Sequence, residues 1–173
     1  VPRAIDAAGS VACWVASAQE VRVSGPTLPT PALRLRLDSA PTDLCLSPDG
    51  VLYVALGGAI HLHDLRRRFD DVRLPTPDFV AWRLAPAAEG GVWALERPSG
   101  RLARLHGRPL RRQTPLPEDY APGVFRPVPE NGNPPALDLV APALSGIAPG
   151  DAPVALAASP QGALALLSWR TDN

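Results

Sequence analysis

Turn glycines recur at a fixed interval in this chain, and each is followed by a short apolar segment. Gly9, Gly50 and Gly91 are each 41 residues apart, and Gly162 follows after a further 71 residues. The segments after the four glycines contain CWVA, LYVA, VWAL and LALL. A unit that repeats at such an interval buries its apolar faces against its neighbours, so the sequence predicts an array of similar units.

The unit around Gly50 is the clearest of the set. It begins with DLCLS at residues 43–47, passes through an SPDG turn into VLYVAL at 51–56, and turns at two glycines into AIHLHDL at 59–65. The segment DVRLP around Val72 completes it. Tight turns between short apolar runs predict four antiparallel strands, and both SPDG and a later SPQG place Pro at the second position of a turn.

Four strands per unit at this interval are typical of a β-propeller, whose blades repeat about every 40 to 45 residues. We therefore expect an all-β fold, a β-propeller of four-stranded blades. About three and a half blades are visible, whereas closed rings generally have about four to eight, which indicates part of a larger ring or an incomplete one. A β-sandwich is the competing fold, because about 14 short strands also suit two stacked sheets.

The expected blades cover residues 4–38, 42–77, 79–114 and 153–173 of a single domain. Between the third and the fourth, residues 115–151 hold nine of the 22 prolines. Because Pro lacks an N–H donor and restrains the residue before it, we expect this segment to be an extended, Pro-rich inserted loop.

Charge and apolar patterning exclude two classes of partner. The 17 basic residues, all Arg, are balanced by 17 acidic ones. This balance leaves no broad basic field for nucleic acid or for an anionic membrane surface. The apolar tract at residues 153–169 is interrupted by Pro160 and Gly162, so we expect no membrane insertion. No signal peptide is visible, which favours a cytoplasmic or particle-associated location and leaves the oligomeric state open.

Residues suited to catalysis or metal binding are few. His61 and His63 share one strand face, but two imidazoles without a third ligand indicate packing rather than a metal site, and Asp64 is expected to be a structural hydrogen-bonding residue. Cys13 and Cys45 show no CxxC spacing and are expected to be free thiols in the core. Since GxSxG is also missing from the sequence, we expect no catalytic residue, no metal and no cofactor.

The candidates for partner contact are arginines at two corresponding turns and two aromatic residues in the Pro-rich loop. They are Arg66, Arg67, Arg68, Arg111, Arg112, Tyr120 and Phe125. The arginines suit an acidic partner surface, although a solvated turn of mixed charge is the competing interpretation. The aromatic residues provide the loop with apolar anchors.

The unit at residues 42–77 resembles the NHL, YVTN and SMP-30-like propeller repeats. LAPAAEGGVWALERPSGRLARLHG at residues 84–107, followed by YAPGVFRPVPENGNPP, is similar to the propeller region of bacterial phage-tail-like proteins associated with contractile injection particles. Glu96 and Arg97 stand where that family has Asp and Arg. The resemblance implies a non-enzymatic structural component whose loops contact other proteins of an assembly.

Two alternative functions remain open. A lactonase-like, metal-dependent propeller hydrolase gathers Glu, Asn and Asp around a central calcium ion, and the expected inner strands here offer Asp6 and Asp43. A carbohydrate-binding propeller needs aromatic platforms at the ends of its blades. Trp14, Tyr53 and Trp93 fall instead in strands where core packing is expected.

Overall fold

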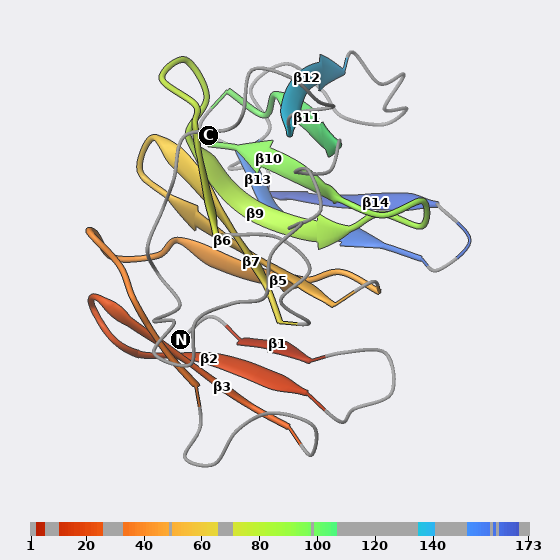
Figure 1. Cartoon of the computed structure of the whole chain (residues 1–173). Coiled ribbons are helices and arrows are strands. Elements are labelled where there is room, and N and C mark those ends of the chain that lie inside the picture. The colour runs from red at the N-terminus through yellow and green to blue at the C-terminus, as the bar shows by residue number, and fades with distance from the viewer. Residues whose placement is uncertain are drawn as a thin grey trace.

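In a computed structural model, the described part of the chain folds into four antiparallel β-sheets (Figure 1). Every regular element in this part is a strand, so the predicted all-β class is confirmed. The structure describes residues 3–5, 11–25, 33–48, 50–65, 71–97, 99–106, 135–140, 152–159, 161 and 163–169.

Three of the sheets have four strands and the fourth has two. The first sheet contains β1 (Arg3–Ile5), β2 (Ala12–Ser17), β3 (Glu20–Ser24) and β4 (Leu33–Arg36). The second contains β5 (Asp43–Leu46), β6 (Val51–Leu56), β7 (Ala59–Asp64) and β8 (Val72–Pro75). The third contains β9 (Ala81–Pro86), β10 (Val92–Glu96), β11 (Leu102–His106) and β12 (Ala136–Val140). The fourth contains β13 (Ala152–Ala158) and β14 (Leu164–Trp169).

Successive sheets meet through their first strands. β5 contacts β1, β9 contacts β5, and β13 contacts β9. Figure 1 shows the sheets following one another from the red N-terminal sheet to the blue β13–β14 pair. At the junction of the second and third sheets, the Thr42 hydroxyl donates to the Ala81 carbonyl (2.8 Å) and the Leu84 N–H donates to the Asp43 carboxylate (2.8 Å).

The second sheet is packed on both faces. Every residue of β6 and β7 is buried. Because alternate side chains point to opposite faces of a strand, β6 divides between two cores. Leu52 and Val54 join a cluster with the first sheet, whereas Val51 and Tyr53 join a cluster with the third. Burial on both faces explains why this strand is apolar throughout instead of alternating with polar residues.

The two Pro-containing hairpins predicted from the sequence are confirmed. Ser47 N–H donates to the Val51 carbonyl (2.9 Å), and Val51 N–H donates back to the Ser47 hydroxyl (3.2 Å), which closes the β5–β6 turn. Ser159 and Ala163 repeat this exchange between β13 and β14, at 2.7 and 3.1 Å. The serine before each Pro therefore closes its hairpin with the same pair of hydrogen bonds.

Both cysteines are buried free thiols, as expected. Cys13 belongs to the core between the first and second sheets, and Cys45 to the core between the second and third. Burial raises the pKa of the Cys45 thiol, so this side chain behaves as an apolar packing group.

The third sheet departs from the predicted boundaries. Its outer strand is β12, which falls within the expected Pro-rich loop of residues 115–151, and it pairs antiparallel with β11 from Leu102↔Val140 to His106↔Ala136. Residues 107–134, where we expected the end of the third blade and most of the loop, lie outside the described residues. A strand can pair across so long a connection because the entropy cost of closing a loop grows only slowly with its length.

Candidate functional site

The seven residues predicted for partner contact are not placed by the structure. Arg66, Arg67, Arg68, Arg111, Arg112, Tyr120 and Phe125 all lie outside the described residues. The site that the described residues do form lies elsewhere, at the outer strands of the second and third sheets.

This site is an open groove of about 270 Å³. Residues 74–79, from the end of β8 and the connection to β9, form one side of it, and Leu137 and Leu139 of β12 form the other. We call it the rim groove. Leu74 and Leu137 also pack against the core between the second and third sheets, so the groove lies directly over that core.

The apolar wall of the rim groove follows from strand alternation in β12. Leu137 and Leu139 point to one face, and Asp138 points to the other, where its carboxylate bonds to His106 of β11. Leu139 is 60% exposed, one of the two large apolar side chains with substantial exposure among the described residues. The strand therefore presents an apolar side chain to solvent at the edge of the groove.

The opposite wall is a tight turn over Thr76, Pro77, Asp78 and Phe79. Phe79 N–H donates to the Thr76 carbonyl (3.1 Å), which closes the turn, and Thr76 N–H donates to the Gly58 carbonyl (2.9 Å), which attaches it to the second sheet. Pro77 occupies the second turn position, for which its fixed φ is suited. Thr76 is only 3% exposed, and its hydroxyl has no hydrogen-bond partner among the described residues.

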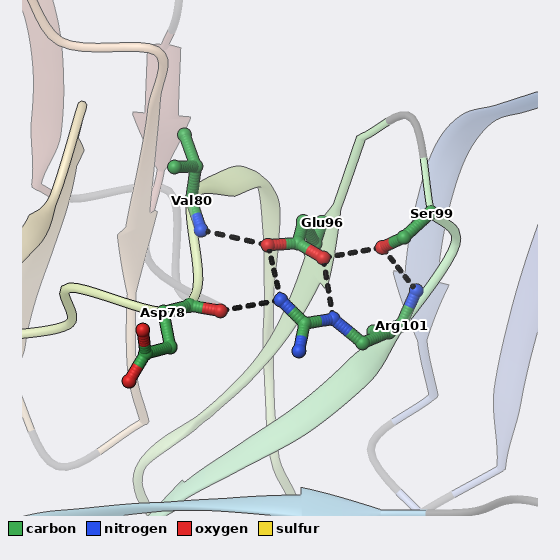
Figure 2. A network of polar contacts seen from close by, with 5 residues as sticks. All are labelled: Asp78, Val80, Glu96, Ser99 and Arg101. Carbon is green, nitrogen blue, oxygen red and sulfur yellow. Dashed lines mark hydrogen bonds and ion pairs between the residues drawn. The ribbon is translucent and has the colours of Figure 1, made fainter.

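A charged network holds this turn against the third sheet, and Figure 2 shows it around Glu96. Arg101 donates to both carboxylate oxygens of Glu96, at 2.6 and 2.8 Å, and also to the Asp78 carbonyl. Val80 N–H donates to the same carboxylate (3.0 Å), and so does the Ser99 hydroxyl. The network therefore joins the β8–β9 connection to the β10–β11 hairpin.

The Glu96 carboxylate is ionised throughout the physiological pH range. Its hydrogen bonds from Arg101, supplemented by those from Ser99 and Val80, lower the pKa of Glu96 to about 2 although the side chain is buried. A buried carboxylate is tolerated when a cation and several donors satisfy its oxygens. Glu96 is therefore a structural support for the groove wall.

Sequence reasoning missed the rim groove because its walls come from two sheets. The expected blade boundaries of 42–77 and 79–114 passed through it at Asp78. A local signal was nevertheless present, because TPDF at residues 76–79 has the same placement of Pro as the SPDG and SPQG turns. That signal predicts the turn, whereas the approach of Leu137 and Leu139 depends on the pairing of β12 with β11.

The predicted histidine pair lies on one face of β7, as expected. The ring centroids of His61 and His63 are 6.3 Å apart and both side chains are buried. His63 Nδ1 lies 3.1 Å from the Asp71 carboxylate, and His61 Nε2 lies 3.7 Å from that of Asp38. Burial, with a smaller contribution from His63, lowers the pKa of His61 to about 4, so this ring is neutral at pH 7.

The described residues offer no metal centre. Among them, no three His, Cys, Asp or Glu side chains gather in an arrangement that could hold a metal ion. Asp43, which the hydrolase alternative would use, instead accepts N–H bonds from Leu44 and Leu84, and burial raises its pKa. Its carboxylate joins two sheets through backbone contacts.

The aromatic residues of strands β2, β6 and β10 differ in exposure. Tyr53 is buried in the core between the second and third sheets, whereas Trp14 and Trp93 are half-buried. The Arg104 guanidinium lies 5.4 Å from the centre of the Trp93 ring and occupies part of its face. These positions favour packing over a stacking platform for a sugar.

Comparisons of the chain with protein-family models, with curated proteins and with solved structures found no match. Within the described ranges, the structure also has no helix long and apolar enough to cross a membrane.

Proposed function

We propose that this protein is a propeller-type scaffold without enzymatic activity that binds other proteins of an assembly. Two features support the propeller arrangement. The first strands of consecutive sheets lie next to one another, and the second sheet buries both faces against its neighbours. These are the contacts expected when four-stranded blades surround a common axis.

The rim groove is the observation that carries the binding role. It is apolar, it opens at the outer strands, and its turn is held by the Glu96–Arg101 network. An exposed apolar site on a rigid support is typical of a surface that contacts another protein. The candidate assembly is a phage-tail-like particle, because that is the family that residues 84–107 resemble.

A sedimentation experiment tests this proposal. Purified 173-residue chain is mixed with contractile injection particles, the particles are pelleted, and the fraction of chain in the pellet is compared with a sample that lacks particles. We expect the chain to pellet only in the presence of particles. A chain that stays in the supernatant and binds no isolated particle subunit overturns the proposal, as does calcium-dependent hydrolysis of a lactone.

A further inference from the structure

We propose that the rim groove binds an extended segment of a partner protein that presents one large apolar side chain beside a Lys or Arg. This inference rests on the proposed function and specifies the chemistry of the partner. It follows from three properties of the groove, which are its volume, an exposed carboxylate and a buried hydroxyl.

The volume and openness of the groove suit one projecting side chain. The groove has about 270 Å³ and is open to solvent, whereas sites for drug-sized molecules and cofactors enclose most of the ligand. Leu74, Phe79, Leu137 and Leu139 supply an apolar lining. An aliphatic or aromatic side chain that projects from a larger partner is therefore the ligand that fits.

The charge at the groove comes from Asp78. Its backbone carbonyl accepts a hydrogen bond from Arg101, but its exposed carboxylate has no hydrogen-bonded or ion-paired partner among the described residues. Figure 2 shows this carboxylate turned away from the guanidinium of Arg101, whose charge is already paired with Glu96. The pKa of Arg101 is raised mainly by its hydrogen bond to Glu96, and the charge of Asp78 helps to raise it. Because Arg101 is hydrogen-bonded to Glu96, the exposed Asp78 carboxylate can still pair with a further cation, and it disfavours phosphate groups of nucleic acids and lipids.

The third property is the Thr76 hydroxyl. A buried hydroxyl without a partner is costly, and Thr76 lines the groove, so a bound segment that offers this hydroxyl a backbone carbonyl as acceptor is favoured. Pro75 and Pro77 have no N–H to donate on this side of the groove. A segment bound here is therefore held by side-chain contacts and by Thr76.

Peptide titration tests the specificity of the rim groove. The probe is the capped peptide Gly-Ser-Gly-Leu-Arg-Gly-Ser, and two control peptides replace its Leu by Ser or its Arg by Glu. The methyl NMR signals of Leu137 and Leu139 in the intact chain report binding. We expect the probe to shift these signals and to bind more tightly than either control. Absence of a shift, or equal affinity for the Arg and Glu peptides, overturns the proposal.

Paired protein variants test which residues bind the probe. Leu139→Ser should weaken probe binding about fivefold, whereas Val80→Ser should not, because Val80 is also exposed but does not line the groove. Asp78→Asn should weaken binding of the Arg peptide about threefold, whereas Asp138→Asn, on the other face of β12, should not. If the two variants of either pair weaken probe binding equally, the probe does not bind in the rim groove as proposed.

Sedimentation with particles separates the two proposals. If Leu139→Ser and Val80→Ser pellet equally, the groove is not the contact and the inference fails, while the scaffold role stands. If the peptide binds the groove but the unmodified chain never pellets, the assembly role fails and the inference about the groove stands. A dimer of this chain that Leu139→Ser dissociates would identify a second copy as the occupant and would overturn the inference.

Discussion

The second and third sheets both contain a buried ionisable side chain whose pKa is lowered, but for opposite reasons. In the second sheet, burial disfavours the charged form of His61 and lowers its pKa to about 4. In the third, hydrogen bonds from Arg101 favour the charged form of Glu96 and lower its pKa to about 2. Burial keeps the first side chain neutral, and hydrogen-bond donors keep the second charged.

This difference reflects how each sheet is held. The second sheet has a neighbour on both faces, and the apolar side chains of β6 and β7 fill the space between them. In the third sheet, polar contacts add to the apolar core: Arg104 donates to the carbonyls of Leu105 and Val92, and Arg101 binds Glu96. Polar contacts therefore fix the outer parts of the third sheet, and the rim groove lies beside them.

The largest expected effect is a loss of stability at a turn of the third sheet. Gly91 has a φ of 73°, and a Cβ at this position would lie 2.2 Å from the Leu105 carbonyl oxygen. Gly91→Ala should reduce the free energy of unfolding by about 3–5 kcal/mol, because it combines backbone strain with a backbone clash. Urea denaturation measures this loss.

Gly57→Ala is the matched control in the second sheet. A Cβ at Gly57 meets no atom within 4 Å, so its effect should stay within about 1 kcal/mol. Equal losses in the two variants would show that the third sheet is no more constrained at its turn than the second.

The next effect is acid destabilisation by His61. Its pKa falls from 6.5 in the unfolded chain to about 4 in the folded one, so the unfolded chain binds more protons between these values. The stability contributed by the neutral ring is complete above pH 6.5 and is lost as the pH falls toward 4, by about 3 kcal/mol in total. Thermal unfolding measured at a series of pH values gives the change in the free energy of unfolding between pH 6.5 and 4.

One histidine variant assigns this pH dependence of stability. His61→Phe should remove most of it, because the substituted ring cannot take up a proton. If His61→Phe keeps the full pH dependence between pH 6.5 and 4, another group is responsible and the contrast with Glu96 fails.

The smallest expected effect is the loss of stability when the charge of Glu96, beside the rim groove, is removed. Glu96→Gln removes the anion that Arg101 binds and should cost about 1–3 kcal/mol at pH 7, as expected for a buried charged hydrogen bond. The difference from the unmodified chain should disappear as the pH falls from about 4.5 to about 2, because Glu96 is then protonated. Glu20→Gln, which breaks an exposed pair with Arg22 in the first sheet, should cause no measurable change.

Local patterns were enough to predict the second sheet. The expected strands at residues 43–47, 51–56 and 59–65 match β5, β6 and β7 almost residue for residue, because apolar runs and Pro or Gly turns lie within one contiguous stretch. The outer strand of the third sheet could not be found in this way. ALDLV gives only a weak strand signal, and its partner β11 is separated from it by residues 107–135.

The candidate site was beyond the reach of local patterns for the same reason. Phe79 and Leu139 line one groove although 60 residues separate them. Partner contact by the Arg and aromatic residues chosen from the sequence stays a prediction, since the described residues do not include them. Individual turns can thus be derived from their own residues, whereas a groove between sheets requires the pairing of distant strands.

The late position of β12 has a consequence for biosynthesis. A ribosome adds about 5–20 residues per second, so residues 107–135 take roughly 1.5–6 s to translate after β11. During that interval the nascent third sheet has an open edge at β11, and the apolar side chains of Leu74 and Phe79 lack the cover that Leu137 provides. On the ribosome, the third sheet therefore cannot be completed until β12 has been synthesised.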